Sequence, residues 1–310
     1  MKRTLSALVA LAFAGFGVFW WLTSPVRAVP LDGGAALETG GDAERGAIVF
    51  NAGGCASCHA TPGQTDRKLL GGGLELKSPF GTFVAPNISP HPTDGIGTWT
   101  VADLANAMLR GVSPEGTHYY PAFPYTTYAH AKIEDIRDLM AYLRTLAPVE
   151  GKARAHDISF PFNIRRGLGL WKQFFLDTTP VKNDAARSPE WNRGKYLVEA
   201  LGHCAECHSS RNPIGGIVAS ERFAGGPDLE GHGWVPNITP SAKGLASWSK
   251  GDISELLSTG FTPDYDSVGS SMADVVRNTG ALAKSDRDAM AEYLKSLPPR
   301  DGPARPPKKN

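Results

Sequence analysis

Residues 55–59 read Cys-Ala-Ser-Cys-His, and residues 204–208 read Cys-Ala-Glu-Cys-His. Together these two stretches contain all four cysteines of the chain. Two thiols spaced by two residues, with a histidine directly after them, form the attachment pattern for c-type haem: the thiols bond to the vinyl groups and the histidine binds the iron. The sequence therefore predicts two covalently bound haem c groups, attached at Cys55, Cys58, Cys204 and Cys207, with His59 and His208 as proximal iron ligands.

A zinc site and a pair of local disulfides are the alternative interpretations of the same cysteines. A Cys₄ zinc site does not need a histidine directly after each pair of thiols. A thioredoxin-like pair belongs in a βαβ unit, and the sequence shows no such unit. The haem interpretation is favoured because it accounts for both histidines and leaves no cysteine over.

The first 28 residues predict an export signal or a membrane anchor. Lys2 and Arg3 precede an uncharged, apolar run over residues 5–22, as in export signals. Residues 26–28, Val-Arg-Ala, offer a cleavage site, whereas Trp20 and Trp21 suit an uncleaved helix that ends at a membrane interface. We favour the retained anchor. In either case we expect the protein on the periplasmic side of a bacterial inner membrane, anchored there or secreted to the periplasm.

The charge balance excludes a nucleic-acid partner of the usual kind. The net charge is +1, but the three charged residues before residue 29 are all basic, which leaves 29 basic against 31 acidic groups. This body carries no basic footprint for nucleic acid. Residues 299–310 combine prolines with basic residues and are predicted to be a disordered tail.

An internal repeat organises the rest of the chain. The second haem motif begins 149 residues after the first, and other segments recur near that offset: residues 85–90 at 235–240, 99–104 at 248–253, 111–114 at 260–263, and 141–146 at 292–297. A repeat this long indicates two copies of one domain. We therefore predict one domain at residues 42–149, a second at 190–298, and an inter-domain strap at 150–189.

Each copy is predicted to contain three helices. The first, at 43–51 or 191–200, runs into the haem motif. The second begins after the capping residue Thr100 or Ser249 and ends at Gly111 or Gly260. The third covers 133–146 or 285–297, where apolar residues recur at helical spacing. Because no sustained strand pattern appears, the predicted fold class is all-α with extensive loops.

The order of helix, haem motif, proline-bearing loop, short helix, distal ligand and final helix resembles class I cytochrome c. More closely, residues 42–298 resemble the cytochrome subunits of periplasmic dehydrogenases. The motifs that carry this resemblance lie at residues 53–59, 80–82, 86–88, 120–125 and 191–194. The family includes the three-haem subunit of membrane-bound alcohol dehydrogenases and the cytochromes that accompany molybdenum-dependent aldehyde or isoquinoline-type dehydrogenases. Two attachment motifs in place of three favour a partner other than the alcohol enzyme.

The resemblance implies an electron carrier with no independent catalysis. The expected donor is a periplasmic dehydrogenase of the molybdenum hydroxylase type or a similar one, and the expected acceptor is a soluble cytochrome or a terminal oxidase. The N-terminal helix would hold the protein at the membrane. The competing interpretation is a dihaem enzyme such as a peroxidase, with an open first haem. A thiosulfate dehydrogenase is disfavoured, because it uses a further cysteine that this chain lacks.

The resemblance also implies a methionine downstream of each haem motif as sixth iron ligand. For the second haem the candidate is Met272, 64 residues after His208; Met290 lies inside the last predicted helix and competes poorly as a core residue. The same repeat register places Phe123 opposite Met272, so the first haem lacks the expected methionine. Methionine raises the potential of a c-type haem, so the second haem is expected to have the higher potential and to receive electrons from the first.

The nearest strong ligand for the first haem is His118, which we predict as its second axial ligand. His130 is the next candidate, and Met108 follows, although the helix pattern favours a core role for it. An open, five-coordinate iron is the remaining alternative.

Two further expectations concern loops. The recurring Pro86 and Pro236 are expected to offer backbone carbonyls to the outer ring nitrogens of His59 and His208, with Pro227 as an alternative acceptor in the second copy. The strap carries aromatic residues at 160–162 and 171–175. These predict either a segment packed across both domains or a docking surface for the dehydrogenase or the membrane.

Overall fold

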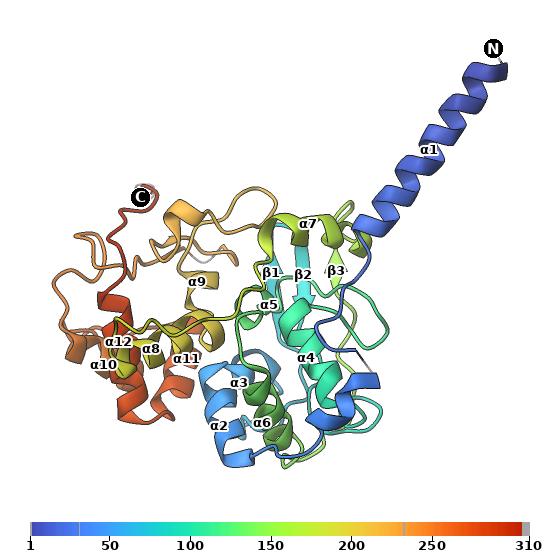
Figure 1. Ribbon diagram of the computed structural model, residues 1–310. Helices are drawn as coiled ribbons and strands as arrows, with labels where there is room; N and C mark the ends of the chain where they lie inside the picture. Colours follow the sequence, from blue (N-terminus) through green and yellow to red (C-terminus); the bar gives the residue numbers. More distant parts are fainter. Residues whose placement is uncertain (1, 31, 232, 306–310) are drawn as a thin grey trace.

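The computed structural model describes residues 2–30, 32–231 and 233–305. Helix α1 (Lys2–Leu22) projects from one corner of a body that has an N-terminal half and a C-terminal half side by side (Figure 1). Residues 4–22 form a helix long and apolar enough to cross a membrane, with a mean hydropathy of 2.0, and none of this stretch is buried against the body.

The N-terminal half is built mainly from helices around the first haem motif. After a 3₁₀ turn at Asp32–Leu37 its elements are α2 (Ala43–Ala52), α3 (Cys55–His59), β1 (Glu75–Ser78), β2 (Gly81–Val84), α4 (Val101–Arg110), α5 (Tyr125–Tyr128) and α6 (Ile133–Leu143). The first, second and last helices confirm the predicted positions to within a few residues.

The strap contributes β3 (Asp157–Ile158), a 3₁₀ turn at Arg165–Gly167 and helix α7 (Leu168–Phe175). Strand β3 pairs antiparallel with β2 and completes a three-stranded sheet with β1. The strap touches both halves, because Lys172 donates hydrogen bonds to the carbonyls of Arg110 and Gly111 while the Trp171 indole donates to the Ile214 carbonyl.

The C-terminal half repeats the helical order around the second haem motif. Its elements are α8 (Pro189–Tyr196) with a π-type turn at Leu197–Leu201, α9 (Cys204–Cys207), a 3₁₀ turn at Ala219–Glu221, β4 (Gly226–Pro227), β5 (Trp234–Val235), α10 (Lys250–Thr259), α11 (Ser271–Gly280) and α12 (Lys284–Lys295).

The predicted ends of the middle helices are confirmed in both halves. Thr100 and Ser249 each close a capping box, with Asp103 and Asp252 as the respective partners. The helices end at left-handed glycines, Gly111 with φ of 58° and the equivalent glycine of α10 with φ of 82°. Left-handed backbone after a last helical turn is favourable for glycine because it has no Cβ.

Each half also packs its first helix against its last through a glycine. A Cβ at Gly46 in α2 would lie 2.0 Å from the carbonyl oxygen of Asp138 in α6, and one at Gly194 in α8 would lie 1.8 Å from that of Ala289 in α12. Neither position can accept a side chain without separating the two helices. The halves therefore share a helix crossing as well as a haem motif.

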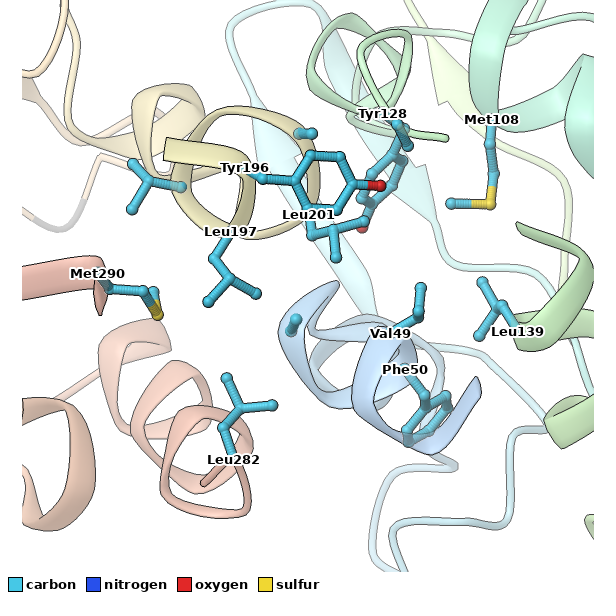
Figure 2. Close-up of a cluster of buried hydrophobic side chains, with 14 of the residues drawn as sticks. Val49, Phe50, Met108, Tyr128, Leu139, Tyr196, Leu197, Leu201, Leu282 and Met290 are labelled. Carbon is cyan, nitrogen blue, oxygen red and sulfur yellow. The ribbon is translucent and has the colours of Figure 1, made fainter. Parts of the chain in front are cut away.

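One cluster of buried apolar side chains joins the two halves. Figure 2 shows Val49 and Leu139 of the N-terminal half facing the same region as Leu197, Leu282 and Met290 of the C-terminal half. The halves therefore do not form separate cores, and a substitution in this cluster is expected to affect both.

Two expectations need correction. The chain is not purely α-helical, since its described residues form five strands; each is two to four residues long, which is too short to leave a reliable alternating pattern in the sequence. The tail expected from residue 299 is not disordered at its start, because the Arg300 carbonyl accepts a hydrogen bond from the Asn237 amide at 2.6 Å and its N–H donates to Thr239. The end of that predicted tail, residues 306–310, lies outside the described residues.

Candidate haem sites

Both haem motifs form a short helix that starts from a left-handed residue. Gly54 precedes α3 with φ of 62°, and His203 precedes α9 with φ of 38°. In each motif the two cysteines, three residues apart in sequence, lie on this helical turn, and the histidine follows them. A left-handed non-glycine residue is uncommon, so His203 marks a position held by its surroundings.

The two proximal histidines are oriented in the same way. Nδ1 of His59 lies 2.8 Å from the carbonyl oxygen of Pro86, and Nδ1 of His208 lies 2.8 Å from that of Pro236. The predicted acceptors are confirmed, and Pro227 is not used for this purpose. A ring N–H donated to a carbonyl fixes the tautomer and leaves Nε2 as the nitrogen that binds a metal.

The environment also favours neutral imidazole rings. Burial lowers the pKa of His59 and of His208, while the bond to the proline carbonyl acts in the opposite direction. A neutral ring is the form that coordinates iron.

Two glycines bring the proline carbonyls within reach of these rings. The N–H of Gly72 donates to the His59 carbonyl, and that of Gly225 donates to the His208 carbonyl, each at 2.9 Å. Both glycines have positive φ, and a Cβ at Gly72 would lie 2.5 Å from the Pro86 oxygen. A side chain here would push the acceptor away from the ring it orients.

The four cysteines fit haem attachment better than the alternatives. All four are free, so neither pair forms a local disulfide. No group of three or more His, Cys, Asp or Glu side chains gathers anywhere in the described residues, which argues against a shared zinc site. Burial raises the pKa of Cys55 to about 12 and that of Cys58 to about 11, as expected for thiols in an apolar pocket.

The two motifs lie close to one another across the boundary between the halves. The hydroxyl of Tyr128 donates to the Gly53 carbonyl at 2.7 Å, and its ring meets the His203 ring edge-on with centroids 5.9 Å apart. The Asn278 amide in α11 donates to the Ser57 hydroxyl inside the first motif at 2.7 Å. The chain's own contacts thus hold the two attachment sites next to each other.

A buried ion pair between Glu206 of the second motif and Arg211 lies at the boundary between the two halves. The carboxylate of Glu206 pairs with Arg211 at 2.6 Å and accepts hydrogen bonds from the hydroxyls of Thr126 and Thr127 in the other half. Burial alone would raise the pKa of Glu206, but the charge of Arg211 and these donors leave it lowered. Nothing in the sequence pattern predicted that the variable position of the motif would join the halves.

The candidate sixth ligand of the second haem sits at the start of a helix. Met272 is the second residue of α11 and packs, half-buried, against the shared core cluster. Met290 is 3% exposed on α12, in agreement with its expected core role. Met272 therefore stays the predicted ligand.

His118 is engaged elsewhere. Its Nε2 lies 2.9 Å from the carbonyl oxygen of Thr23, and its Nδ1 lies 3.0 Å from the ammonium of Lys172. Both ring nitrogens therefore have partners, and binding iron would require breaking one of these buried bonds. We do not retain His118 as the axial ligand of the first haem.

The other candidates for the first haem fare no better. Nδ1 of His130 lies 2.5 Å from the carbonyl oxygen of Thr179 in the strap, and Met108 is 4% exposed within the core cluster. Phe123, the repeat counterpart of Met272, packs with its ring centroid 5.8 Å from that of Tyr128. The position that carries methionine in the second half thus carries an aromatic ring in the first.

The family profile described as cytochrome c matches residues 43–147. A "Diheme cytochrome c-type" protein of Cereibacter sphaeroides is 52% identical over 96% of this chain and 99% of its own length. The cytochrome c subunit of a quinone alcohol dehydrogenase of Gluconacetobacter polyoxogenes is 38% identical over 90% of this chain. A nicotinate dehydrogenase subunit of Pseudomonas putida is 40% identical over 82% of it. The chain spans 62% of the alcohol dehydrogenase subunit and 21% of the nicotinate dehydrogenase subunit.

Proposed function

This chain belongs to the family of dihaem c-type cytochromes, and we propose that it carries electrons from a periplasmic dehydrogenase to a respiratory acceptor. It binds two haem c groups covalently, which supply reversible one-electron transfer when bound. Relatives named as cytochrome subunits of dehydrogenases support the carrier role.

The repeated orientation of His59 and His208 by a proline carbonyl is the observation that carries this proposal. Each ring is held at 2.8 Å from its acceptor, in the tautomer that leaves Nε2 for the iron. The cysteines of each motif hold the macrocycle beside that ring. A histidine held this way positions an iron for electron transfer.

We propose that residues 42–149 and 190–298 are two tandem cytochrome c domains. The matching capping boxes, the glycine crossings and the histidine–proline bonds support this division. Residues 150–189 act as the strap between them. Because both halves contribute to one core cluster, we propose that the two domains unfold together.

The protein's own residues support a direction of electron flow. Met272 is available in the second domain, whereas the first domain has Phe123 at the same place. Methionine raises the potential of a c-type haem, so we propose that the second site has the higher potential. Electrons would then enter at the first site and leave from the second.

The end of the N-terminal helix supports a retained membrane anchor. Thr23 is fully buried, and Asn106 holds the backbone of residues 28 and 29 through hydrogen bonds of 2.7 to 2.9 Å. Cleavage after Ala28 would remove a residue that fills the first domain. We therefore propose that α1 stays attached and places the body on the periplasmic side of the inner membrane.

The partner is proposed by class only. The relatives include cytochrome subunits named for alcohol, fructose and gluconate dehydrogenases as well as a nicotinate dehydrogenase subunit. A dehydrogenase of the molybdenum hydroxylase type is one member of this set. A soluble cytochrome or a terminal oxidase is the proposed acceptor.

A dihaem peroxidase is the second candidate function, because none of His118, His130 and Met108 offers a clear sixth ligand to the first iron. Added peroxide or cyanide distinguishes the two functions. A carrier keeps its spectrum and does not consume peroxide, whereas a peroxidase binds cyanide at one haem and turns peroxide over.

Potentiometric titration tests the carrier proposal directly. We expect two separate midpoints, and in a Met272→Leu variant the higher one should fall and the sulfur-to-iron charge-transfer band should vanish. The matched control is Met290→Leu, which alters a buried core methionine and should leave both midpoints in place. Coincident midpoints in the unmodified protein would remove the basis for the proposed direction.

A further inference from the structure

The foot of helix α1 is fastened to the strap through one arginine. The guanidinium of Arg166 donates to the hydroxyls of Thr23 at 2.9 Å and Ser24 at 3.0 Å, and also to the carbonyl of Trp20. It stacks on the Trp20 ring with its central carbon 3.8 Å from the ring centroid. The last turn of α1 is thus held in a fixed place on the body.

Helix α7 lies directly against the same turn. A Cβ at Gly169 would lie 2.5 Å from the Cα of Thr23, so the two backbones are in contact there. Gln173, one turn further along α7, donates to the Leu22 carbonyl at 3.5 Å. Figure 1 shows α7 on the side of the body from which α1 emerges. Wherever α1 leaves a membrane, α7 must therefore be close to that surface.

The polarity of α7 is opposite to that of an ordinary surface helix. Its charged residue Lys172 is buried, whereas Leu170 and Phe174, which share a face at i and i+4, are 36% and 78% exposed. Surface helices of soluble domains turn apolar residues inward and charged residues outward. An outward apolar face of this kind is expected where the surroundings are not water.

Neighbouring side chains extend this apolar face. Phe160 is 78% exposed, Ile164 52% and Phe162 41%, all on the strap just before α7. Ile214, which is 53% exposed, lies beside α7 because its carbonyl accepts the Trp171 hydrogen bond. We call this set the apolar rim: Phe160, Phe162, Ile164, Leu170, Phe174 and Ile214.

We propose that the apolar rim inserts into the interfacial layer of the membrane that α1 crosses. The proposal rests on the retained anchor. At a rise of 1.5 Å per residue the 19 residues of the span measure about 28 Å, close to the ~30 Å of a bilayer core, so the last turn lies at the interface. The rim is fixed to that turn through Arg166 and Gly169. Exposed aromatic and aliphatic side chains at this depth replace water contacts with lipid contacts.

The charge of the strap fits the same occupant. Residues 159–176 contain no acidic side chain; of their three basic ones, Lys172 is buried and Arg165 and Arg166 are partly exposed. Basic groups next to an apolar face favour anionic headgroups and stabilise attachment at the interface. With α1 and the rim both in contact with lipid, the body is held at two places, and its orientation to the membrane is fixed instead of free about a single tether.

Photocrosslinking in a lipid bilayer tests this proposal on the unmodified, haem-loaded full chain. The protein is placed in nanodiscs of phosphatidylcholine and phosphatidylglycerol that include phosphatidylcholine with a diazirine on its acyl chain. After irradiation, lipid adducts are mapped by peptide mass spectrometry. We expect adducts on α1 and on peptides covering residues 159–176. The loop around Tyr265, whose side chain is 92% exposed in the C-terminal half, serves as the internal control and should carry none.

A double variant, Phe160→Ser with Phe174→Ser, should lower the yield of strap adducts several-fold while the adducts on α1 persist. Both side chains are highly exposed, so this variant leaves the core intact. Adducts confined to α1 in the unmodified chain would overturn the rim proposal while keeping the anchor. A mature mass that lacks residues 1–28, with no adducts anywhere, would instead overturn the anchor on which it rests.

Discussion

The carbonyl oxygen of Thr23 lies 2.9 Å from Nε2 of His118, across 95 residues of sequence. On the other side of the ring, Nδ1 accepts a hydrogen bond from Lys172 at 3.0 Å. The two contacts together require a neutral ring with its proton on Nε2. Burial is the main cause that lowers the pKa of His118, and it keeps the ring neutral. A single histidine therefore joins the foot of α1 to α7 in the strap.

His118→Gln is expected to leave the spectrum of the first haem unchanged. Glutamine can keep only part of the bonding to Thr23 and Lys172, so we expect unfolding to become easier by about 1–3 kcal/mol. Electron paramagnetic resonance of the oxidised protein follows the iron, and denaturant unfolding follows stability. Conversion of a low-spin first haem to a high-spin one would show that His118 is a ligand after all.

Lys172 should give the protein an unusual alkaline pH dependence. Burial lowers its pKa from 10.5 to about 7, while the carbonyls of Arg110 and Gly111 favour the charged form. Between pH 7 and 10.5 the unfolded chain holds more protons than the folded one. Stability then rises with pH by at most about 1.4 kcal/mol per unit, and this contribution is lost as pH falls towards 7.

Denaturant unfolding at several pH values between 7 and 10.5 measures how the free energy of unfolding changes with pH. In Lys172→Met the ammonium is absent, so the contribution to the slope should vanish. Because His118 is already neutral in this range and Tyr125 faces the ammonium only through its ring, 4.7 Å away, neither is expected to replace the effect. An equal slope in the variant and the parent would refute the assignment to Lys172.

Local sequence patterns predicted what local geometry determines. The caps at Thr100 and Ser249, the left-handed Gly111 and the carbonyls of Pro86 and Pro236 all depend on residues near them in the chain or on the repeat. Capping and turn chemistry act over a few residues, and in a duplicated segment the same capping residues and glycines occur twice in the sequence. These features could therefore be predicted before the fold was known.

Contacts between distant segments left no such pattern. The partners of His118 come from positions 23 and 172, and the inward side of α7 packs on the foot of α1 through Gly169 and on the end of α4 through Lys172. Periodicity describes which side chains share a face, but it does not say what covers the face. The prediction of His118 as an iron ligand could not take account of this, since the sequence does not show that both nitrogens of its ring have partners in the fold.

Glu206→Gln should destabilise the boundary between the two domains. The substitution keeps a side chain of the same size but leaves the guanidinium of Arg211 buried without a counter-charge. Removing one partner of a buried ion pair costs about 3–5 kcal/mol. Thermal unfolding followed by circular dichroism measures the loss.

The matched control is Glu75→Gln, which breaks an exposed ion pair. The side chain of its partner Arg154 is 50% exposed and that of Glu75 is 48% exposed. Exposed pairs contribute at most about 1 kcal/mol. If both variants lose the same small amount of stability, the pair at Glu206 does not hold the domains together.

Phe123→Met is expected to make the first site resemble the second. Phe123 occupies the repeat position of Met272, and its ring lies among those of Tyr119, Tyr125 and Tyr128. A methionine of similar volume fits there with little loss of packing, because its unbranched chain adapts to irregular gaps. The new thioether should bind the first iron and raise its potential towards that of the second site. Phe123→Leu is the control, since it removes the ring without supplying sulfur and should leave the first iron as it was. Absorption spectra should then show a second sulfur-to-iron band only in the methionine variant, and potentiometric titration should show a narrower gap between the midpoints.

The contrary outcome is that the methionine and leucine variants give the same spectra and the same midpoints. In that case residue 123 does not lie where a sixth ligand of the first iron would bind, and the difference between Phe123 and Met272 is not the cause of the two potentials.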